Sequence, residues 1–196
     1  MAYIGMRHVV AAKITSHTDG SAPTYGTGMV IGKAILGNLT INRGTNPLYA
    51  DDAIAEDDNG ITSADLELGM DDLLEDAQEY LGITKKVTTG EGTSAVTKYL
   101  DTGNAANDVG VGYIRVRVKN GETKFQTVWN YSAKFGITAE NSATKGEAIE
   151  WQTPTVTGRL KGLLVDSSGD ITYREKRIFD GYSDAVAYLN SLANIT

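Results

Sequence analysis

The sequence contains no cysteine, only two histidines and only three prolines among its 196 residues. The lack of cysteine excludes a disulfide framework, a thiolate metal site and a cysteine nucleophile. His8 and His17 have no second histidine or carboxylate at the spacing of metal ligands on a helix or strand, so neither a metal site nor a histidine-based triad is expected. These absences predict a protein that is not an enzyme and needs no cofactor.

Long apolar runs are also missing. About 18 consecutive apolar residues are needed to cross a membrane, and no such run occurs; the N-terminal MAYIGMRHVV also lacks the form of a signal segment. We therefore expect a chain that is made and kept in the cytoplasm and has no membrane partner. The formal net charge of −7 argues against ordinary DNA or RNA binding, which needs a dominant basic surface.

The residues that are present form mainly strand patterns, in a chain long enough for one domain, 1–196, with a real core. The clearest pattern is a hairpin over 112–129, where Asn120-Gly121 is the preferred dipeptide of a type I′ turn. This turn pairs Val118 with Thr123, Val116 with Phe125 and Ile114 with Thr127 on one face, and Lys119 with Glu122, Arg117 with Lys124 and Arg115 with Gln126 on the other. One face is then apolar and the other polar, as a half-buried hairpin requires.

Weaker strand patterns lie on both sides of this hairpin. Further strands are predicted at 7–16, 32–43 with a bulge at Gly37, around 48–50, 62–68, 134–140 and 147–161, and a last hairpin joins 161–165 to 171–177. Long glycine-rich and polar segments, about 15–28, 44–60 and 84–109, are predicted to be loops. The first two loops are too poor in apolar residues to pack on their own subunit, so we expect neighbouring subunits to order them.

One strand pattern passes directly into a helix pattern, between Thr62 and Gly82. The apolar stripe of this helix consists of Met70, Leu73, Leu74, Ala77 and Leu81, and acidic residues fill its other side. Asp72 and Glu75 have the spacing of a capping box, and Gly82 is a suitable stop. The pattern predicts a helix over about 71–81 that flanks a sheet, with its acids solvated. A short helix is also predicted from Ser183 to about Asn194.

Two charged segments are candidate sites. The segment 44–60 contains Asp51, Asp52, Glu56, Asp57 and Asp58, but an EF-hand alignment places Ala55 and Leu66 where carboxylates are required. The predicted hairpin carries a basic strip of Arg115, Arg117, Lys119 and Lys124. This strip is either a solvated sheet face or a contact for phosphate or an acidic protein surface. All nine residues are candidates for subunit contacts or for a lumen lining.

Three segments together resemble a known family. YGTGMVIGKAILGNLT, LYADDAIAEDDNGITSADLELGMDDLLEDAQEYLG and TKGEAIEWQTPTVTG resemble, in this order from Tyr25 to Gly158, the major tail proteins of long, non-contractile-tailed bacteriophages of Gram-positive hosts (siphophages). The resemblance implies two packed antiparallel sheets in a sandwich or barrel-like fold with a flanking helix. It also implies hexameric rings that stack into a tail tube, with one sheet of each subunit lining the lumen.

The resemblance also implies the partners and the location. These are neighbouring rings, tape-measure, tail-tip and tail-terminator proteins, and DNA that passes through without specific binding, in a virion tail assembled in the host cytoplasm. Six copies at −7 bring about −42 charges to a ring, so we expect an acidic lumen that repels DNA.

Other readings remain open at this stage. One is a β-sandwich module that binds a small ligand or carbohydrate, with Trp129 and Trp151 as the only tryptophans for its cleft. Another is the tube protein of a phage-related secretion system. A third is a hydrolase that uses a carboxylate pair such as Asp57 and Asp58, although nothing in this polar segment would bury the pair and raise its pKa.

Overall fold

The computed structural model describes residues 2–44, 46–50, 53–58, 60–90, 95–101, 106–139 and 153–196. The strands are β1 (Ala2–Ser16), β2 (Thr24–Tyr25), β3 (Met29–Gly32), β4 (Ala34–Arg43), β5 (Asn46–Ala50), β6 (Ala53–Asp58), β7 (Ile61–Met70), β8 (Thr84–Thr89), β9 (Val96–Asp101), β10 (Val109–Lys119), β11 (Glu122–Ala139), β12 (Thr155–Leu160), β13 (Leu163–Leu164), β14 (Ile171–Thr172) and β15 (Arg174–Phe179). The helices are α1 (Glu75–Leu81) and α2 (Tyr182–Leu192).

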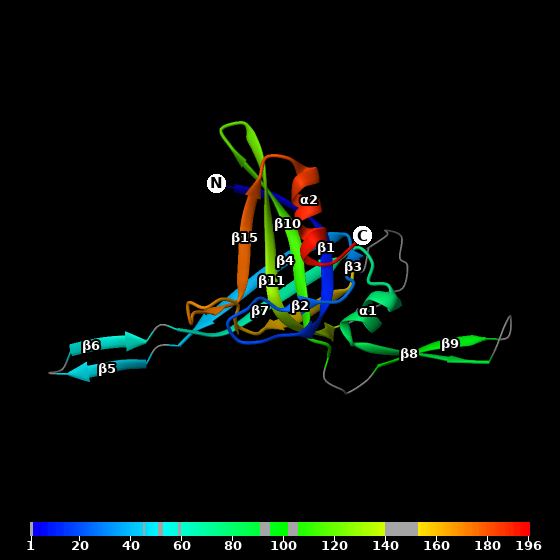
Figure 1. Cartoon of the computed structure of the whole chain (residues 1–196), viewed down its shortest axis with the longest axis horizontal. Coiled ribbons are helices and arrows are strands. Elements are labelled where there is room, and N and C mark those ends of the chain that lie inside the picture. The colour runs from blue at the N-terminus through cyan, green and yellow to red at the C-terminus, as the bar shows by residue number, and fades with distance from the viewer. Residues whose placement is uncertain are drawn as a thin grey trace, which may run out of the picture.

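Strands dominate the fold, which confirms the prediction of a mainly β protein. Within the described residues, nine strands form one antiparallel sheet in the order β2-β1-β10-β11-β12-β7-β4, with β15 paired to β11 and β3 paired to β1. The resemblance implied two packed antiparallel sheets in a sandwich or barrel-like fold. Here the two packed layers belong to one sheet, which bends so that the β12-β7-β4 part crosses the β1-β10 part (Figure 1).

Strand β11 joins the two parts of the sheet. Its first residues pair with β10 on one side and, over Phe125–Asn130, with β15 on the other. Its last residues, from Ala133 to Ala139, pair with β12. One continuous strand therefore belongs to both parts.

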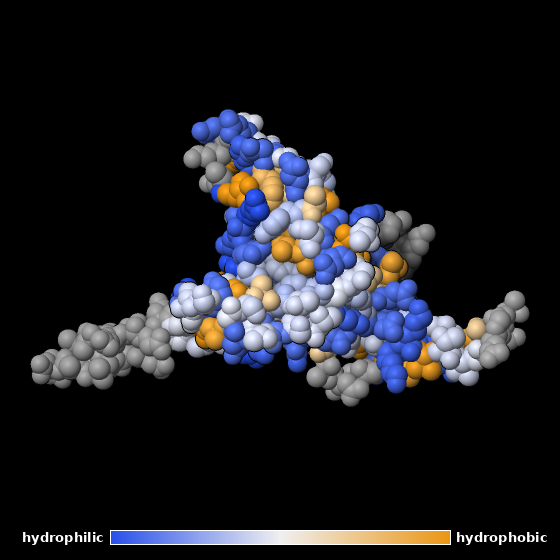
Figure 2. Space-filling view, in the orientation of Figure 1, coloured by the Kyte–Doolittle hydropathy of each residue, from blue (hydrophilic) through white to orange (hydrophobic). Residues whose placement is uncertain are grey.

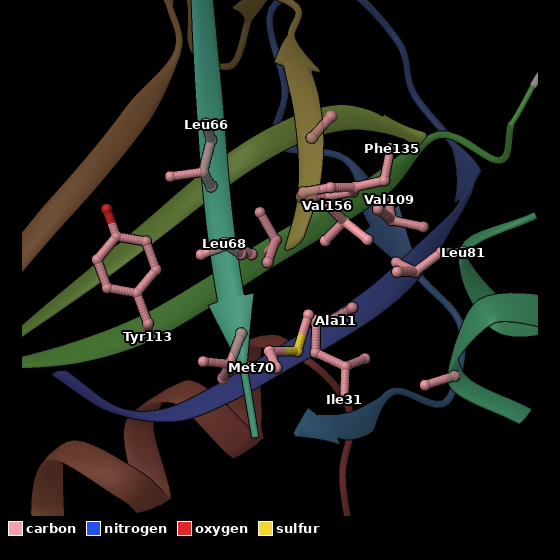
Figure 3. Packing of buried hydrophobic residues seen from close by; sticks show 14 of the residues in the cluster. Ala11, Ile31, Leu66, Leu68, Met70, Leu81, Val109, Tyr113, Phe135 and Val156 are labelled. Carbon is pink, nitrogen blue, oxygen red and sulfur yellow. The ribbon is translucent and has the colours of Figure 1, made fainter. Parts of the chain in front are cut away.

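Apolar residues are buried on both faces of the β1-β10-β11 part. On one face Val9, Val109 and Tyr113 pack toward Leu66 and Leu68 of β7 across the bend (Figure 3). On the other face a second buried cluster includes Trp129 and is closed by α2 through Ala185, Leu189 and Ala193. The central strands are thus covered on both faces, which explains why their buried residues do not simply alternate.

Helix α1 flanks the sheet as predicted, but it is shorter than the stripe suggested. It begins at Glu75, its N-cap position is Leu74, and no side chain caps it, so the predicted capping box is wrong. Ala77 and Leu81 are buried, whereas Leu74 is 60% exposed because it precedes the helix. Gly82 ends the helix in the left-handed conformation, as predicted. Hydrophilic residues cover the outer side of this region (Figure 2).

The β10-β11 hairpin has the predicted register, pair for pair, from Ile114 with Thr127 to Lys119 with Glu122. Asn120 and Gly121 both have positive φ, 52° and 81°, as a type I′ turn requires.

We expect Gly121→Ala to lower the free energy of unfolding by about 1 kcal/mol, because a Cβ is strained at this φ. The measurement is the urea midpoint. Gly136→Ala is the matched control, since a Cβ there meets nothing within 4 Å and the φ is not left-handed. Equal midpoints for the two variants would contradict the turn assignment.

The segment predicted as a free loop at 15–28 packs on its own chain. Tyr25 is buried edge-on against Trp129, with ring centroids 5.1 Å apart. Its hydroxyl donates to the Tyr131 carbonyl at 2.8 Å and accepts from Trp129 Nε1 at 3.2 Å. Burial raises the pKa of this hydroxyl, so it stays protonated and keeps donating. A single tyrosine thus anchors a segment that composition alone assigned to neighbouring subunits.

Removing this hydroxyl should therefore destabilise the fold. Tyr25→Phe leaves two buried polar groups without their partner and should cost about 1 to 2 kcal/mol of unfolding free energy. Tyr182→Phe, at a partly exposed ring, should change the urea midpoint little. An unaffected Tyr25→Phe would show that the segment is held by something other than this anchor.

The other two predicted loops contain hairpins. Strands β5 and β6 pair within 44–60 and project from the body, and β8 and β9 pair within 84–109 on the opposite side (Figure 1). The predicted strand near 48–50 is the end of β5. The β8-β9 hairpin is tied to α1, because Asp76 accepts hydrogen bonds from Lys86 at 2.8 Å and from Tyr99 at 3.1 Å.

Smaller differences concern strand boundaries. The pairing of β4 with β7 is irregular between Ala34 and Leu36 and again between Asn42 and Arg43, rather than at Gly37. Strand β1 begins at Ala2 rather than at residue 7, and β12 begins at Thr155, after Pro154. The predicted last hairpin is reduced to the short β13-β14 pair, and the residues that follow form β15 on the edge of β11.

Candidate assembly surfaces

The outward face of the β11-β12-β7-β4 part is polar apart from glycine and Leu36, which lies opposite Gly69 near the start of β4 and is 39% exposed. Its inward face supplies Leu66, Leu68 and Val156 to the core, so the alternating residues point outward. These outward residues are Lys134 and Gly136 on β11, Thr155, Thr157 and Arg159 on β12, Ser63, Asp65 and Glu67 on β7, and Asn38, Thr40 and Asn42 on β4. Short side chains dominate, and the two acids are matched by two bases.

Hydrogen bonds across strands order this polar face. The Asn38 amide donates to the Glu67 carboxylate at 3.2 Å, and the Asn42 amide donates to Ser63 Oγ at 2.9 Å. Such cross-strand pairs hold polar side chains flat against the sheet. The result is a wide hydrophilic surface, and its Lys134 and Arg159 also line an open hollow at the border of this face.

Both outer strands of this part leave a ladder edge open. Strand β4 ends the strand order, and no described strand pairs with its outer edge. Among the described strands, residues 134–139 of β11 pair with β12 and with no other, because the pairing with β10 ends at Ala133. Unpaired edges of this length are templates for pairing with another chain. The two edges lie on opposite sides of the polar face, so one copy offers two complementary contacts.

The predicted basic strip is part of a larger cluster of cations and tyrosines, which we call the Tyr3 cluster: Tyr3, Tyr113, Arg115, Arg117, Arg174 and Lys176. The Arg115 guanidinium lies 5.2 Å from the Tyr3 ring centroid and 5.3 Å from that of Tyr113. Arg117 lies 5.7 Å from the Tyr3 ring. Sequence reasoning missed Arg174 and Lys176 because nothing in the pattern indicated that β15 pairs with β11.

The cations of the Tyr3 cluster have no acidic partner in the described part of the chain, where the ion pairs involve other residues. Burial lowers the pKa of Arg174, and the charge of Arg115 lowers it further. Burial likewise lowers the pKa of Lys176, followed by the charges of Arg174 and Arg115. Arg117 Nε is buried without a hydrogen-bond acceptor among the described residues. The described residues therefore leave the charge of the cluster uncompensated.

The other predicted site residues lie elsewhere. Lys124 is bonded to Asp180, which raises the lysine pKa, so this end of the strip is neutralised within the chain. Lys119 lies opposite Glu122 in the strand register, beside the turn. Glu56, Asp57 and Asp58 lie on β6 in the projecting hairpin. Asp51 and Asp52 lie outside the described residues.

The described residues form two open hollows, and the side chains that line them do not make a catalytic group. The larger, about 490 Å³, is lined by Lys134, Arg159, Lys161 and a single acid, Asp108, which pairs with Lys134 at 3.5 Å. The smaller, about 300 Å³, is lined mainly by apolar residues of β4, β7 and β14. Among the described residues no group of three potential metal ligands occurs. His8 instead hydrogen-bonds to Asn190 at 2.8 Å, which suits a structural role.

The structure adds no support for the two alternative functions, carbohydrate binding and hydrolysis. Trp129 is 1% exposed, beneath Tyr25 and α2, so it cannot stack on a carbohydrate. Trp151 lies outside the described residues. Asp57 and Asp58, the carboxylates considered for hydrolysis, lie on β6.

Comparison with known proteins gives no match, either to a family model or to a curated protein. Within the described residues, no helix is long and apolar enough to span a membrane.

Proposed function

We propose that this chain is the structural subunit of a bacteriophage tail tube, and that six copies form a ring whose stacked repeats enclose a passage for DNA. The observation that carries the proposal is the four-stranded part β11-β12-β7-β4, which is polar on its outward face except for Leu36 and has no described strand paired at either outer edge. The resemblance of three sequence segments to major tail proteins supports the same function. This function requires no catalytic residues.

The two open edges supply a way to close a ring. If β4 of one copy pairs with residues 134–139 of β11 in the next, the sheets of all copies join into one continuous wall. Each polar face then turns to the same side of the wall. A closed cyclic arrangement leaves no free edge, which is the usual solution for a sheet that must stay soluble.

We propose that this polar face lines the lumen. Its charges balance, with Asp65 and Glu67 against Lys134 and Arg159, so the described part of the face does not provide the acidic lining expected from net charge. Many of its other side chains are short and neutral, such as Thr40 and Thr155, so the face has few cations that could bind DNA phosphates. In this proposal DNA moves because the wall offers little to bind, and the excess of acids lies outside the lumen, on β6 and around α1.

Electron microscopy of the protein produced together with its neighbouring tail genes tests the proposal. The expected particles are rings or tubes with sixfold symmetry in which this chain is the main component. The isolated chain is not a sufficient sample, since tube subunits can await a template before they assemble. Tail particles that lack this chain would overturn the proposal.

A further inference from the structure

We propose that the Tyr3 cluster of one copy is the docking site for the acidic β5-β6 hairpin of another copy. This inference deepens the proposed function by assigning a contact between subunits. It rests on the proposed function in one respect, namely that the assembly containing this contact is a tail tube. The occupant is a second copy of this chain, and the contact is formed by cations and tyrosine rings on one side and carboxylates on the other.

The first argument is charge complementarity. The cluster presents four cations without an ion-pair partner in the described chain. The segment 46–58 contains five acids and no lysine or arginine, and this absence of bases extends from Gly44 to Thr84. A segment so uniformly acidic repels itself in isolation and is attracted to a surface of the opposite sign.

The second argument is unused bonding capacity. Arg115 donates from Nη2 to the Tyr113 hydroxyl at 3.1 Å, and no bond from its other donors to a described residue is found. Arg117 Nε is buried without an acceptor among the described residues. A buried donor without a partner is costly, and guanidinium groups bind carboxylates through two parallel hydrogen bonds. A carboxylate placed between Arg115 and Arg117 would satisfy both needs.

The third argument is shape. Figure 1 shows the β5-β6 hairpin projecting away from the body, while β10 and β15, which carry the cations, belong to the body itself. Tyr3 is 51% exposed and Ile178, on the same face of β15, is 52% exposed, so an apolar and aromatic border surrounds the cations. The hairpin cannot fold back on its own cluster without leaving this extended position, so the partner is another copy.

A charge exchange tests the inference. The cluster variant is Arg117→Glu with Lys176→Glu, and the hairpin variant is Glu56→Lys with Asp57→Lys. The cluster variant leaves two cations and two acids in the cluster, and the hairpin variant leaves three acids and two lysines in 46–58. Each variant alone therefore loses most of the charge complementarity and should associate about a hundredfold more weakly than the unchanged chain. An equal mixture restores the contact between an unchanged cluster and an unchanged hairpin at every second position, so part of the association should be recovered. The samples are produced together with the neighbouring tail genes, and association is measured by sedimentation velocity and by electron microscopy at low salt. Rising salt should weaken the contact.

A matched control changes the same net charge on another surface. Lys85→Glu with Lys98→Glu, both exposed on the β8-β9 hairpin, should leave association unchanged. Monomer stability separates docking from folding: Lys176→Gln should not destabilise the monomer, since it removes one of several repelling cations, yet it should weaken association.

Three outcomes would overturn the inference. One is association of the cluster variant at the level of the control. Another is failure of the mixture to recover when both variants remain folded. The last is saturable binding of inorganic phosphate or duplex DNA to Arg115 and Arg117 of the unchanged chain, which would assign the cluster to phosphates. In each case rings could still form through the sheet edges, so the tail tube proposal is tested separately by the particles themselves.

Discussion

A cysteine placed on each open edge of the polar sheet should turn an assembled ring into a ladder of covalently linked chains. The variant combines Thr40→Cys on β4 with Gly136→Cys on β11. Residues opposite each other on paired strands have Cβ atoms about 4.5 to 5.5 Å apart, close to the distance that a disulfide needs. Because the sequence has no cysteine of its own, every linked band on a non-reducing gel reports these two positions.

The expected ladder ends at six chains, and each single-cysteine variant should run as one chain or a dimer. Asn38→Cys and Asn42→Cys, each combined with Gly136→Cys, cover the neighbouring registers on the same face. The control pair combines Ser183→Cys with Gly136→Cys, since Ser183 lies in α2 on the other side of the sheet. If the control pair links as efficiently as the edge pairs, or if no edge pair links within intact tubes, the walls are not closed through β4 and β11.

Lysines introduced into the polar face should slow the release of DNA from a complete virion. Thr40→Lys with Thr155→Lys adds two cations to each copy, and therefore about twelve to a ring of six, on a face that now has balanced charge. Phosphate contacts release counterions and are strongly salt-dependent, so release should be at least about tenfold slower at about 50 mM salt and should recover as salt rises. Release kinetics from purified virions measure both effects.

The control for this experiment places the same two charges away from the sheet face. Ser183→Lys in α2 with Thr97→Lys in β9 adds the same net charge, and release should stay at the original rate. Both variants should form tails of normal length, because substitutions at exposed strand and helix positions cost little stability. Equal slowing by both variants would mean that the polar face does not line the passage.

The parts of the fold that the sequence predicted correctly depend mostly on local patterns. The β10-β11 hairpin was predicted pair for pair because Asn120-Gly121 fixes the turn and the turn fixes the register. The stop of α1 at Gly82 was equally local. The late start of α1 was missed, because Leu73 and Leu74 fit the helical period although they precede the helix, and only Leu73 is buried.

Long-range pairing explains what the sequence could not predict. The cations of β15 join those of β10 only because both strands pair with β11, and no periodicity in the sequence reports which strands are neighbours. The loop that holds Tyr25 was predicted to be free because its composition is polar, yet one buried ring against Trp129 is enough to hold it. The open edges of β4 and β11 could not be predicted for the same reason, because an edge is open only when no other strand pairs with it.

The continuity of β11 also has a mechanical consequence. Its 18 residues run without interruption from the turn beside Asn120 to the open edge at Ala139. A pull applied at one end of this strand is resisted by ladder hydrogen bonds to β10, β15 and β12 together, loaded in shear along the strand. The two parts of the sheet cannot slide past each other unless these bonds break. The subunit should therefore transmit force along this strand, and bending strain should collect at the register shift between β11 and β10 opposite Val109 and Val111, where the two parts of the sheet meet.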